Sequence, residues 1–325
     1  MKKNWRLFAI FLALTMIFSL VACSNADEKQ PTGSEEPSDV EEQTDTLKVG
    51  VLMKTMSDTY SNKLGTAIET YMEDNYPDVT LLMLDGQADI SKQISQAEDL
   101  IAQNVDVIVL NPQDADGSAQ VLDLAQEADI PVIEVNTETV RTDYLSFIGS
   151  YDVEAGEIMG EYVAEANGGK GQVAILEGLM GQSPQLLRKE GIDNVLKDYP
   201  EIEVVSTLSA DWSRDKAMAV TEDWLGKYPD LVAIISENDD MAMGAVQAAE
   251  AQERDLVIVG TDGIPDAVQA IKDGRMSASV LQDAVGQAQM AMDVAVKVAK
   301  NEEVEPEYLV PFQLITADNV DDFIE

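Results

Sequence analysis

The chain has 325 residues, with 61 acidic and 21 basic side chains, a formal net charge of −40 and no histidine. Such an acidic surface repels nucleic acid and anionic lipid headgroups, so we expect no nucleic-acid partner. The lack of histidine removes the commonest general base and zinc ligand, together with any Ser-His-Asp or Cys-His catalytic arrangement.

The first 22 residues predict a secretory signal peptide of the lipoprotein type. Three basic residues precede an apolar run from Leu7 to Val21, and Ala22 leads into Cys23. The run is too short for a comfortable transmembrane helix. We expect Cys23 to become the lipidated first residue and to anchor the chain at the outer face of the cell membrane. The alternative is a plain signal peptide with an incidental cysteine.

Residues 23–46 predict a disordered tether. They are rich in Glu, Asp, Ser, Thr and Gln and contain almost no apolar side chains. Such a segment cannot bury enough surface to offset the entropy that ordering would cost. The remainder, from Leu47 onward, is long enough for two domains.

From Leu47, short apolar runs alternate with amphipathic stretches. The predicted strands are 47–53, 80–84, 105–110, 131–135, 145–149, 172–176, 204–208, 231–236, 256–260 and 278–281. The predicted helices between them include 62–75, 90–103, 155–167, 216–227 and 284–300. Runs such as 105–110 are nearly continuously apolar, as strands covered on both faces must be. This alternation predicts doubly wound parallel α/β sheets, and the number of strands predicts two lobes.

Short polar side chains follow successive predicted strands. In open parallel sheets, ligands bind outside the carboxyl ends of the strands, so these positions are candidate binding residues. They are Asp58, Tyr60, Asn136, Thr137, Asn238, Asp262 and Gln282. Structural alternatives stay open, since Asp239 could serve as a helix N-cap and Asp262–Gly263 could form only a turn.

These residue types suit a neutral polyhydroxyl ligand. A sugar hydroxyl both donates and accepts hydrogen bonds, and the C–H face of a sugar ring stacks on aromatic planes. Tyr60 and Trp212 are the candidate stacking residues, whereas Trp224 is expected in the core. Arg188 could donate several hydrogen bonds to ring oxygens, the alternative being a surface arginine on a helix.

Two segments carry a resemblance to a known family. Residues 236–245 read Ser-Glu-Asn-Asp-Asp-Met-Ala-Met-Gly-Ala, similar to the "NND-MAMGA" segment of periplasmic sugar-binding proteins of the ribose and glucose/galactose class. Residues 259–265 are similar to the "G-D-P" turn that follows in that family. The resemblance covers the chain from about Leu47 to its end, and it implies the receptor component of an ABC importer.

The resemblance also implies a set of sugar contacts. They are Asp58, Tyr60, Asn136, Thr137, Arg188, Trp212, Asn238, Asp262 and Gln282. Gln182 joins this set, because Gln182 and Pro184 stand where the glucose/galactose member carries a histidine and an aspartate. In place of that relative's calcium loop the chain has only the turn 168–171, so we expect no metal site.

The implied fold is that of a type I periplasmic binding protein, with two lobes joined by a hinge and crossovers near Tyr151, Gln282 and Val310. The expected N-terminal lobe is 47–150 plus 283–309, and the expected C-terminal lobe is 151–282 plus 310–325. The sugar should lie between the lobes, because contacts to both would favour the closed state.

We therefore expect an extracytoplasmic, monomeric receptor that delivers a hexose or pentose to an ABC permease, with no cofactor and no enzymatic activity. One alternative is a sensory receptor of the same fold that signals through a chemoreceptor or sensor kinase. Another is an extracellular hydrolase that uses Asp58 and Asp262 as a carboxylate pair.

Overall fold

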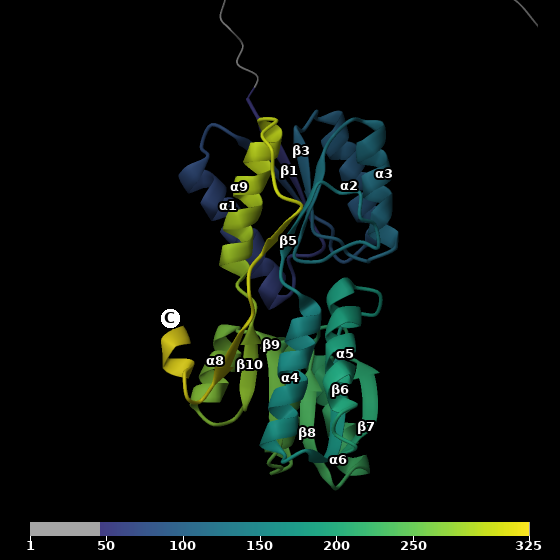
Figure 1. The fold of residues 1–325 in the computed structure, drawn as a ribbon, viewed down its shortest axis with the longest axis vertical. Coiled ribbons are helices and arrows are strands. Elements are labelled where there is room, and N and C mark those ends of the chain that lie inside the picture. The colour runs from purple at the N-terminus through teal and green to yellow at the C-terminus, as the bar shows by residue number, and fades with distance from the viewer. Residues whose placement is uncertain (1–45, 325) are drawn as a thin grey trace, which may run out of the picture. The chain divides into compact units, whose positions relative to one another are not determined.

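The computed structural model describes residues 46–324, which fold into two six-stranded β-sheets flanked by helices (Figure 1). The predicted signal peptide, Cys23 and nearly all of the predicted tether lie outside these residues. Within the described part of the chain, no helix is long and apolar enough to cross a bilayer. The predicted fold class, two doubly wound α/β lobes, is confirmed.

The first sheet and its helices make up the N-terminal lobe. The strand order is β11-β5-β4-β3-β1-β2, and every pairing is parallel. Its strands are β1 (Lys48–Met53), β2 (Thr80–Asp85), β3 (Val107–Leu110), β4 (Val132–Val135), β5 (Ser146–Gly149) and β11 (Glu307–Leu309). Its helices are α1 (Thr59–Asn75), α2 (Ile90–Ala102), the 3₁₀ turn η1 (Gly117–Ala119), α3 (Gln120–Glu127) and α9 (Ala284–Ala299).

The second sheet and its helices make up the C-terminal lobe. The strand order is β12-β10-β9-β8-β6-β7, with β12 antiparallel to β10 and the other pairings parallel. Its strands are β6 (Lys170–Glu177), β7 (Glu201–Ser209), β8 (Leu231–Ser236), β9 (Val257–Asp262), β10 (Ala278–Leu281) and β12 (Gln313–Thr316). Its helices are α4 (Asp152–Ala166), α5 (Ser183–Leu196), α6 (Arg214–Lys227), α7 (Asp239–Ala251), α8 (Pro265–Lys272) and the 3₁₀ turn η2 (Val320–Phe323).

Each sheet is covered on both faces and therefore borders two separate cores. On β1, Val51 packs toward α1 and α9, and its neighbour Leu52 packs toward α2 and α3. On β6, Leu176 packs toward α6 and α7, and Ile175 packs toward α4 and α5. Successive side chains of a strand point to opposite faces, which explains why these strands are apolar at consecutive positions.

The chain passes between the two sheets three times, between β5 and α4, between β10 and α9, and between β11 and β12. Each lobe is therefore assembled from segments that are distant in the sequence. The ten predicted strands all overlap observed strands, and two of the four edge strands, β11 and β12, were not predicted.

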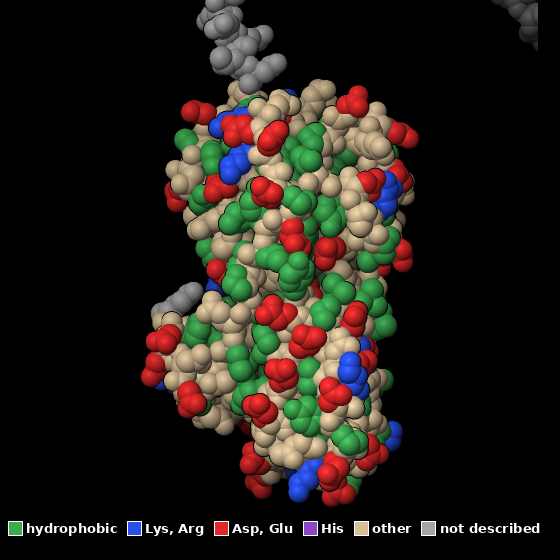
Figure 2. Space-filling model, in the orientation of Figure 1, with side chains coloured by type: hydrophobic (Ala, Val, Ile, Leu, Met, Phe, Trp, Pro, Cys, Tyr) green, Lys and Arg blue, Asp and Glu red, His purple; other side chains and the backbone are tan. Residues whose placement is uncertain are grey.

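Acidic side chains are spread over both lobes on the face shown in Figure 2, and basic side chains are fewer there. This pattern follows from the composition of 61 acidic and 21 basic residues. On this face the acidic residues form a solvated surface and do not gather into one patch.

Candidate ligand-binding site

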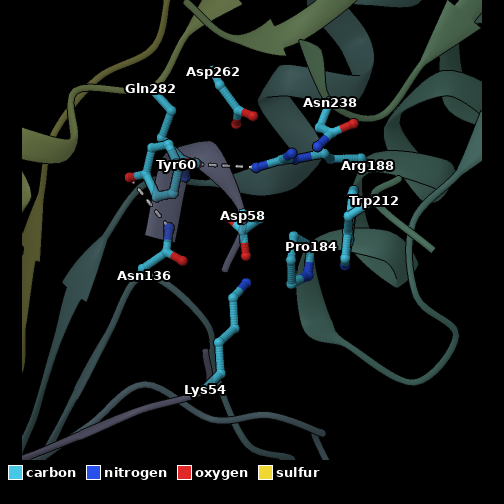
Figure 3. A pocket seen from close by; sticks show the side chains of 10 residues that line it. All are labelled: Lys54, Asp58, Tyr60, Asn136, Pro184, Arg188, Trp212, Asn238, Asp262 and Gln282. Atoms are coloured by element: carbon cyan, nitrogen blue, oxygen red, sulfur yellow. Dashed lines mark hydrogen bonds between the residues drawn. The ribbon is translucent and has the colours of Figure 1, made fainter. Parts of the chain in front are cut away.

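A cavity, which we call the inner cavity, lies where the carboxyl ends of strands from both sheets meet. It has about 340 Å³ of space that protein atoms do not fill, part of it open to solvent. The lining residues, shown in Figure 3, are Lys54, Asp58, Tyr60, Asn136, Pro184, Arg188, Trp212, Asn238, Asp262 and Gln282. The first four come from the N-terminal lobe, the next five from the C-terminal lobe, and Gln282 from the crossover after β10.

Helix caps orient two of the polar residues. Asp58 is the N-cap of α1, where its Oδ1 accepts a hydrogen bond of 2.7 Å from the backbone N–H of Ser61. Asn238 caps α7 in the same way through Met241, at 2.9 Å. An N-cap fixes the side-chain rotamer and uses only one polar atom. The second carboxylate oxygen of Asp58 and the amide nitrogen of Asn238 have no hydrogen-bond partner among the described residues.

Arg188, on α5, is 3% exposed and held in place by three hydrogen bonds. Its Nε donates to Asp152 Oδ1 at 2.7 Å, Nη1 to the carbonyl of Glu237 at 2.5 Å, and Nη2 to Gln282 Oε1 at 3.2 Å. A guanidinium has five N–H groups, so two remain for a ligand. The guanidinium carbon also lies 5.9 Å from the centre of the Trp212 ring.

Two neighbouring groups of the inner cavity are buried without a protein partner. The carboxylate of Asp262, the last residue of β9, makes no hydrogen bond to the described residues and is 7% exposed. Burial raises the pKa of Asp262 well above its usual range, and Arg188 opposes that rise. The amide nitrogen of Gln282 is buried and has no partner either. Buried polar groups are nearly always hydrogen-bonded, so this arrangement calls for a ligand or water.

Tyr60 and Asn136 belong to a hydrogen-bonded network behind the cavity wall. The Tyr60 hydroxyl donates to Gln287 Oε1 at 3.0 Å, and Asn136 Nδ2 donates to the same oxygen at 3.3 Å. Gln287 Nε2 in turn donates to Ser150 Oγ at 3.0 Å. Burial raises the pKa of Tyr60 well above its usual range, so the hydroxyl keeps its proton, and its hydrogen bond to Gln287 holds the ring in this wall.

Eight of the ten residues proposed from the sequence line the inner cavity, and Thr137 and Gln182 do not. The hydroxyl of Thr137 accepts a hydrogen bond from Asn111 Nδ2 at 2.9 Å and donates to the carbonyl of Pro112 at 2.8 Å. Gln182 Oε1 accepts a hydrogen bond of 2.8 Å from the indole N–H of Trp212. Thr137 thus supports the site from behind its lining, and Gln182 holds the Trp212 indole in place.

Lys54 and Pro184 line the inner cavity although the sequence did not single them out as contacts. Lys54 directly follows β1, so its place at a strand end was a usable signal. Its side chain is 7% exposed, and its ammonium group has no hydrogen-bond partner among the described residues. Burial lowers the pKa of Lys54, and the nearby carboxylate of Asp58 opposes that shift. Figure 3 shows the ammonium group pointing toward Asp58.

The structure also shows what the carboxylate of Asp239 does. The N-cap of α7 is Asn238 and not Asp239, which was the alternative considered from the sequence. The Asp239 carboxylate accepts hydrogen bonds from the backbone N–H groups of Gly263, at 2.7 Å, and Ile264, at 3.0 Å. It therefore fixes the turn that follows Asp262.

Within residues 46–324, no group of three or more Cys, Asp or Glu side chains is arranged to hold a metal ion.

Comparison with known proteins gives the family. Residues 49–303 match the model of the periplasmic binding protein domain. The putative rhizopine-binding protein of Rhizobium meliloti is 34% identical over 276 residues, 81% of this chain and 89% of that protein. The ribose import binding protein of Bacillus subtilis is 30% identical over 309 residues, 95% of this chain and 98% of that protein.

A solved structure leads to the same family. It is an ABC transporter solute-binding protein from Bacillus halodurans with bound myo-inositol, and it superposes with a TM-score of 0.83 at 32% identity. The match covers 86% of this chain and 97% of that one. The chain therefore belongs to the periplasmic binding protein family, as a sugar-binding protein of the ABC-transporter type.

Proposed function

We propose that the chain is an extracytoplasmic receptor that binds a neutral monosaccharide or cyclic polyol in the inner cavity and presents it to an ABC permease. The observation that carries the proposal is the unpartnered pair of Asp262 and Gln282 beside the two remaining N–H groups of Arg188. A carboxylate accepts two hydroxyl protons, while the amide and guanidinium groups donate to the same hydroxyl oxygens. Two adjacent hydroxyls of a sugar or inositol ring satisfy all of these groups.

The charges in the inner cavity favour a neutral ligand. Arg188 is already paired with Asp152, both side chains being 4% exposed, and Lys54 lies near Asp58. A neutral ligand can hydrogen-bond to these groups without bringing a further charge into the buried cavity, which would be costly. Tyr60 and Trp212 supply aromatic surfaces for the apolar face of a ring.

Hydrogen bonds between the lobes support a hinge mechanism. Thr59 Oγ1 donates to Asp240 Oδ2 at 2.7 Å, and the backbone N–H of Glu138 donates to Ser183 Oγ at 2.8 Å. A ligand that contacts both lobes binds the closed form more tightly and so shifts the population toward it. In this proposal the closed form docks on the permease, and lipidation of Cys23 holds the receptor at the membrane.

A thermal-shift screen of the purified protein tests the proposal. A ligand that binds only the folded state raises the melting temperature by mass action. We expect a shift with at least one neutral pentose, hexose or inositol, no turnover of the bound sugar, and a 1:1 stoichiometry in calorimetry. A flat response to the whole panel would contradict the monosaccharide assignment. Co-purification with a sensor kinase in place of a permease would favour the sensory alternative.

A further inference from the structure

A second and larger space adjoins the inner cavity. This outer chamber has about 920 Å³ of space that protein atoms do not fill, part of it open to solvent, and it shares Lys54, Asp58 and Trp212 with the inner cavity. Its remaining lining comes from both lobes, for example from Thr55 and from Gln182. The three shared residues make the two spaces neighbouring parts of one site.

The outer chamber contains polar side chains whose hydrogen-bonding capacity is unused. Gln113 is 4% exposed, and its Oε1 is buried without a partner. Gln182 is 3% exposed; its Oε1 is occupied by the Trp212 indole, and its Nε2 has no partner among the described residues. The ammonium group of Lys54 is a third unused donor, on the boundary with the inner cavity. Of these groups, the Gln182 amide nitrogen and the Lys54 ammonium can donate to a polar occupant of the chamber.

The charged residues of the outer chamber are largely neutralised by protein partners. Arg214 Nη2 donates to Asp240 Oδ1 at 2.8 Å, and Asp240 Oδ2 receives the Thr59 hydroxyl. Asp211 pairs with Lys216 at 2.5 Å. A neutral hydroxylated group can hydrogen-bond here without displacing either ion pair.

We propose that the outer chamber is a second subsite, which takes a second sugar ring or a comparably hydroxylated aglycone attached to the ring in the inner cavity. The ligand of the complete site is then a disaccharide or glycoside, and Trp212 forms the wall that both rings contact. This inference rests on the proposed function, because it assigns the first ring to the inner cavity.

The test compares one-ring and two-ring ligands by isothermal titration calorimetry on the purified protein. The probes are glucose, galactose, ribose and myo-inositol, together with disaccharides and galactinol that carry these rings through different linkages. We expect at least one two-ring ligand to bind tenfold or more tightly than its own single ring. If no two-ring ligand exceeds its single ring, the second subsite is ruled out while the monosaccharide receptor stands. If neither kind binds, both proposals fail.

Two site variants and one control variant locate the gain in affinity. Leu179→Trp fills the outer chamber with a side chain that does not line the inner cavity, so two-ring affinity should fall at least tenfold and one-ring affinity should stay within twofold. Leu186→Trp is the matched control, because Leu186 is 50% exposed on α5 and lines neither space. Gln113→Leu removes the unpartnered amide oxygen and should weaken only two-ring ligands. Equal affinities of all three variants for the two-ring ligand would overturn the proposal.

Discussion

The carboxylate of Asp262 is buried at the end of β9 with no hydrogen bond to the described residues, although Arg188 is close enough to oppose its pKa shift. Burying a charged carboxylate without a hydrogen-bond partner costs free energy, so Asp262 does not stabilise the ligand-free protein. Its place in the cavity is explained if it binds a ligand. Strained or unsatisfied positions of this kind are typical of functional sites.

Replacing Asp262 or Trp212 by alanine should weaken sugar binding by a hundredfold or more, about 3 kcal/mol, because each removes a contact that only a ligand completes. Asp262→Ala should not lower the melting temperature of the ligand-free protein, since it removes a poorly solvated carboxylate. Calorimetry and thermal melts measure both effects. Asp273→Ala, which changes an exposed acid near the end of α8, is the control. Unchanged affinity in both site variants would refute the inner cavity as the sugar site.

Gly178 sets the position of Trp212 because it has no side chain. A Cβ at residue 178 would lie 1.9 Å from the indole ring, and the backbone N–H of Gly178 is held by Glu237 Oε2 at 2.7 Å. Gly178→Ala should therefore displace the indole, weaken sugar binding tenfold or more and shift tryptophan fluorescence. Gly226→Ala is the control, because a Cβ there meets nothing within 4 Å and lies inside α6. That control should keep its affinity and gain about 1 kcal/mol of stability.

At the scale of elements, helix caps determine where the polar residues of the site point. Helix α1 begins at Thr59 and not at the predicted residue 62, because Asp58 caps it and commits the chain to helix from that point. The edge strands β11 and β12 were missed because they are short and largely unburied, so they lack the apolar runs that identify central strands. Helix caps and short edge strands such as β11 and β12 depend on a few local contacts, and the hydrophobic periodicity of the sequence does not predict these contacts.

Strand β4 contains a buried acid that should make stability depend on pH. Glu134 is fully buried, and its carboxyl group accepts hydrogen bonds from the backbone N–H of Thr139 at 3.0 Å and from the Thr139 hydroxyl at 2.7 Å. Burial raises the pKa of Glu134 to about 8, and the Thr139 hydrogen bonds oppose that rise. The folded protein therefore keeps a proton that the unfolded chain releases above its ordinary pKa of 4.5.

The sign of the resulting effect is that stability is lost as pH rises. The contribution of Glu134 is fully present below about pH 4.5 and disappears as pH approaches 8, a loss on the order of 4 kcal/mol. Urea unfolding of the wild type between pH 5 and pH 8 should show this decline, and Glu134→Gln should show much less of it. Parallel pH profiles for the two proteins would mean that Glu134 is ionised in the folded state.

At the scale of the whole molecule, the proposed hinge closure would draw on contacts to the ligand and on direct contacts between the lobes. The hydrogen bond from Thr59 to Asp240 is one such contact, and the backbone bond of 3.0 Å from Ala115 N–H to the carbonyl of Gly181 is another. Contacts that exist only in the closed form raise the apparent affinity, because they increase the fraction of molecules that are ready to bind.

Thr59→Val keeps the shape of the side chain and removes this hydrogen bond. We expect the affinity for a one-ring sugar to fall about fivefold, which corresponds to roughly 1 kcal/mol. Small-angle scattering should show a more open ligand-free protein and an unchanged ligand-bound one. Thr66→Val, at an exposed position of the same helix, provides the matched control. Identical affinities of the two variants would show that this contact does not contribute to closure.

The sequence by itself determined the α/β class, the central strands and most of the polar residues that line the inner cavity. It could do so because buried parallel strands are apolar runs and because their carboxyl ends meet at one edge, so Asp262 and Asn136 were identifiable from position alone. Only the tertiary structure decided which polar atoms lack a hydrogen-bond partner within the protein and so can bind a ligand. Thr137 has the same kind of position as Asn136, but its hydroxyl is occupied by Asn111 and Pro112, whereas Lys54 has no partner. These hydrogen-bond partners are distant in the sequence, and a local sequence pattern does not predict which distant residues the fold brings into contact.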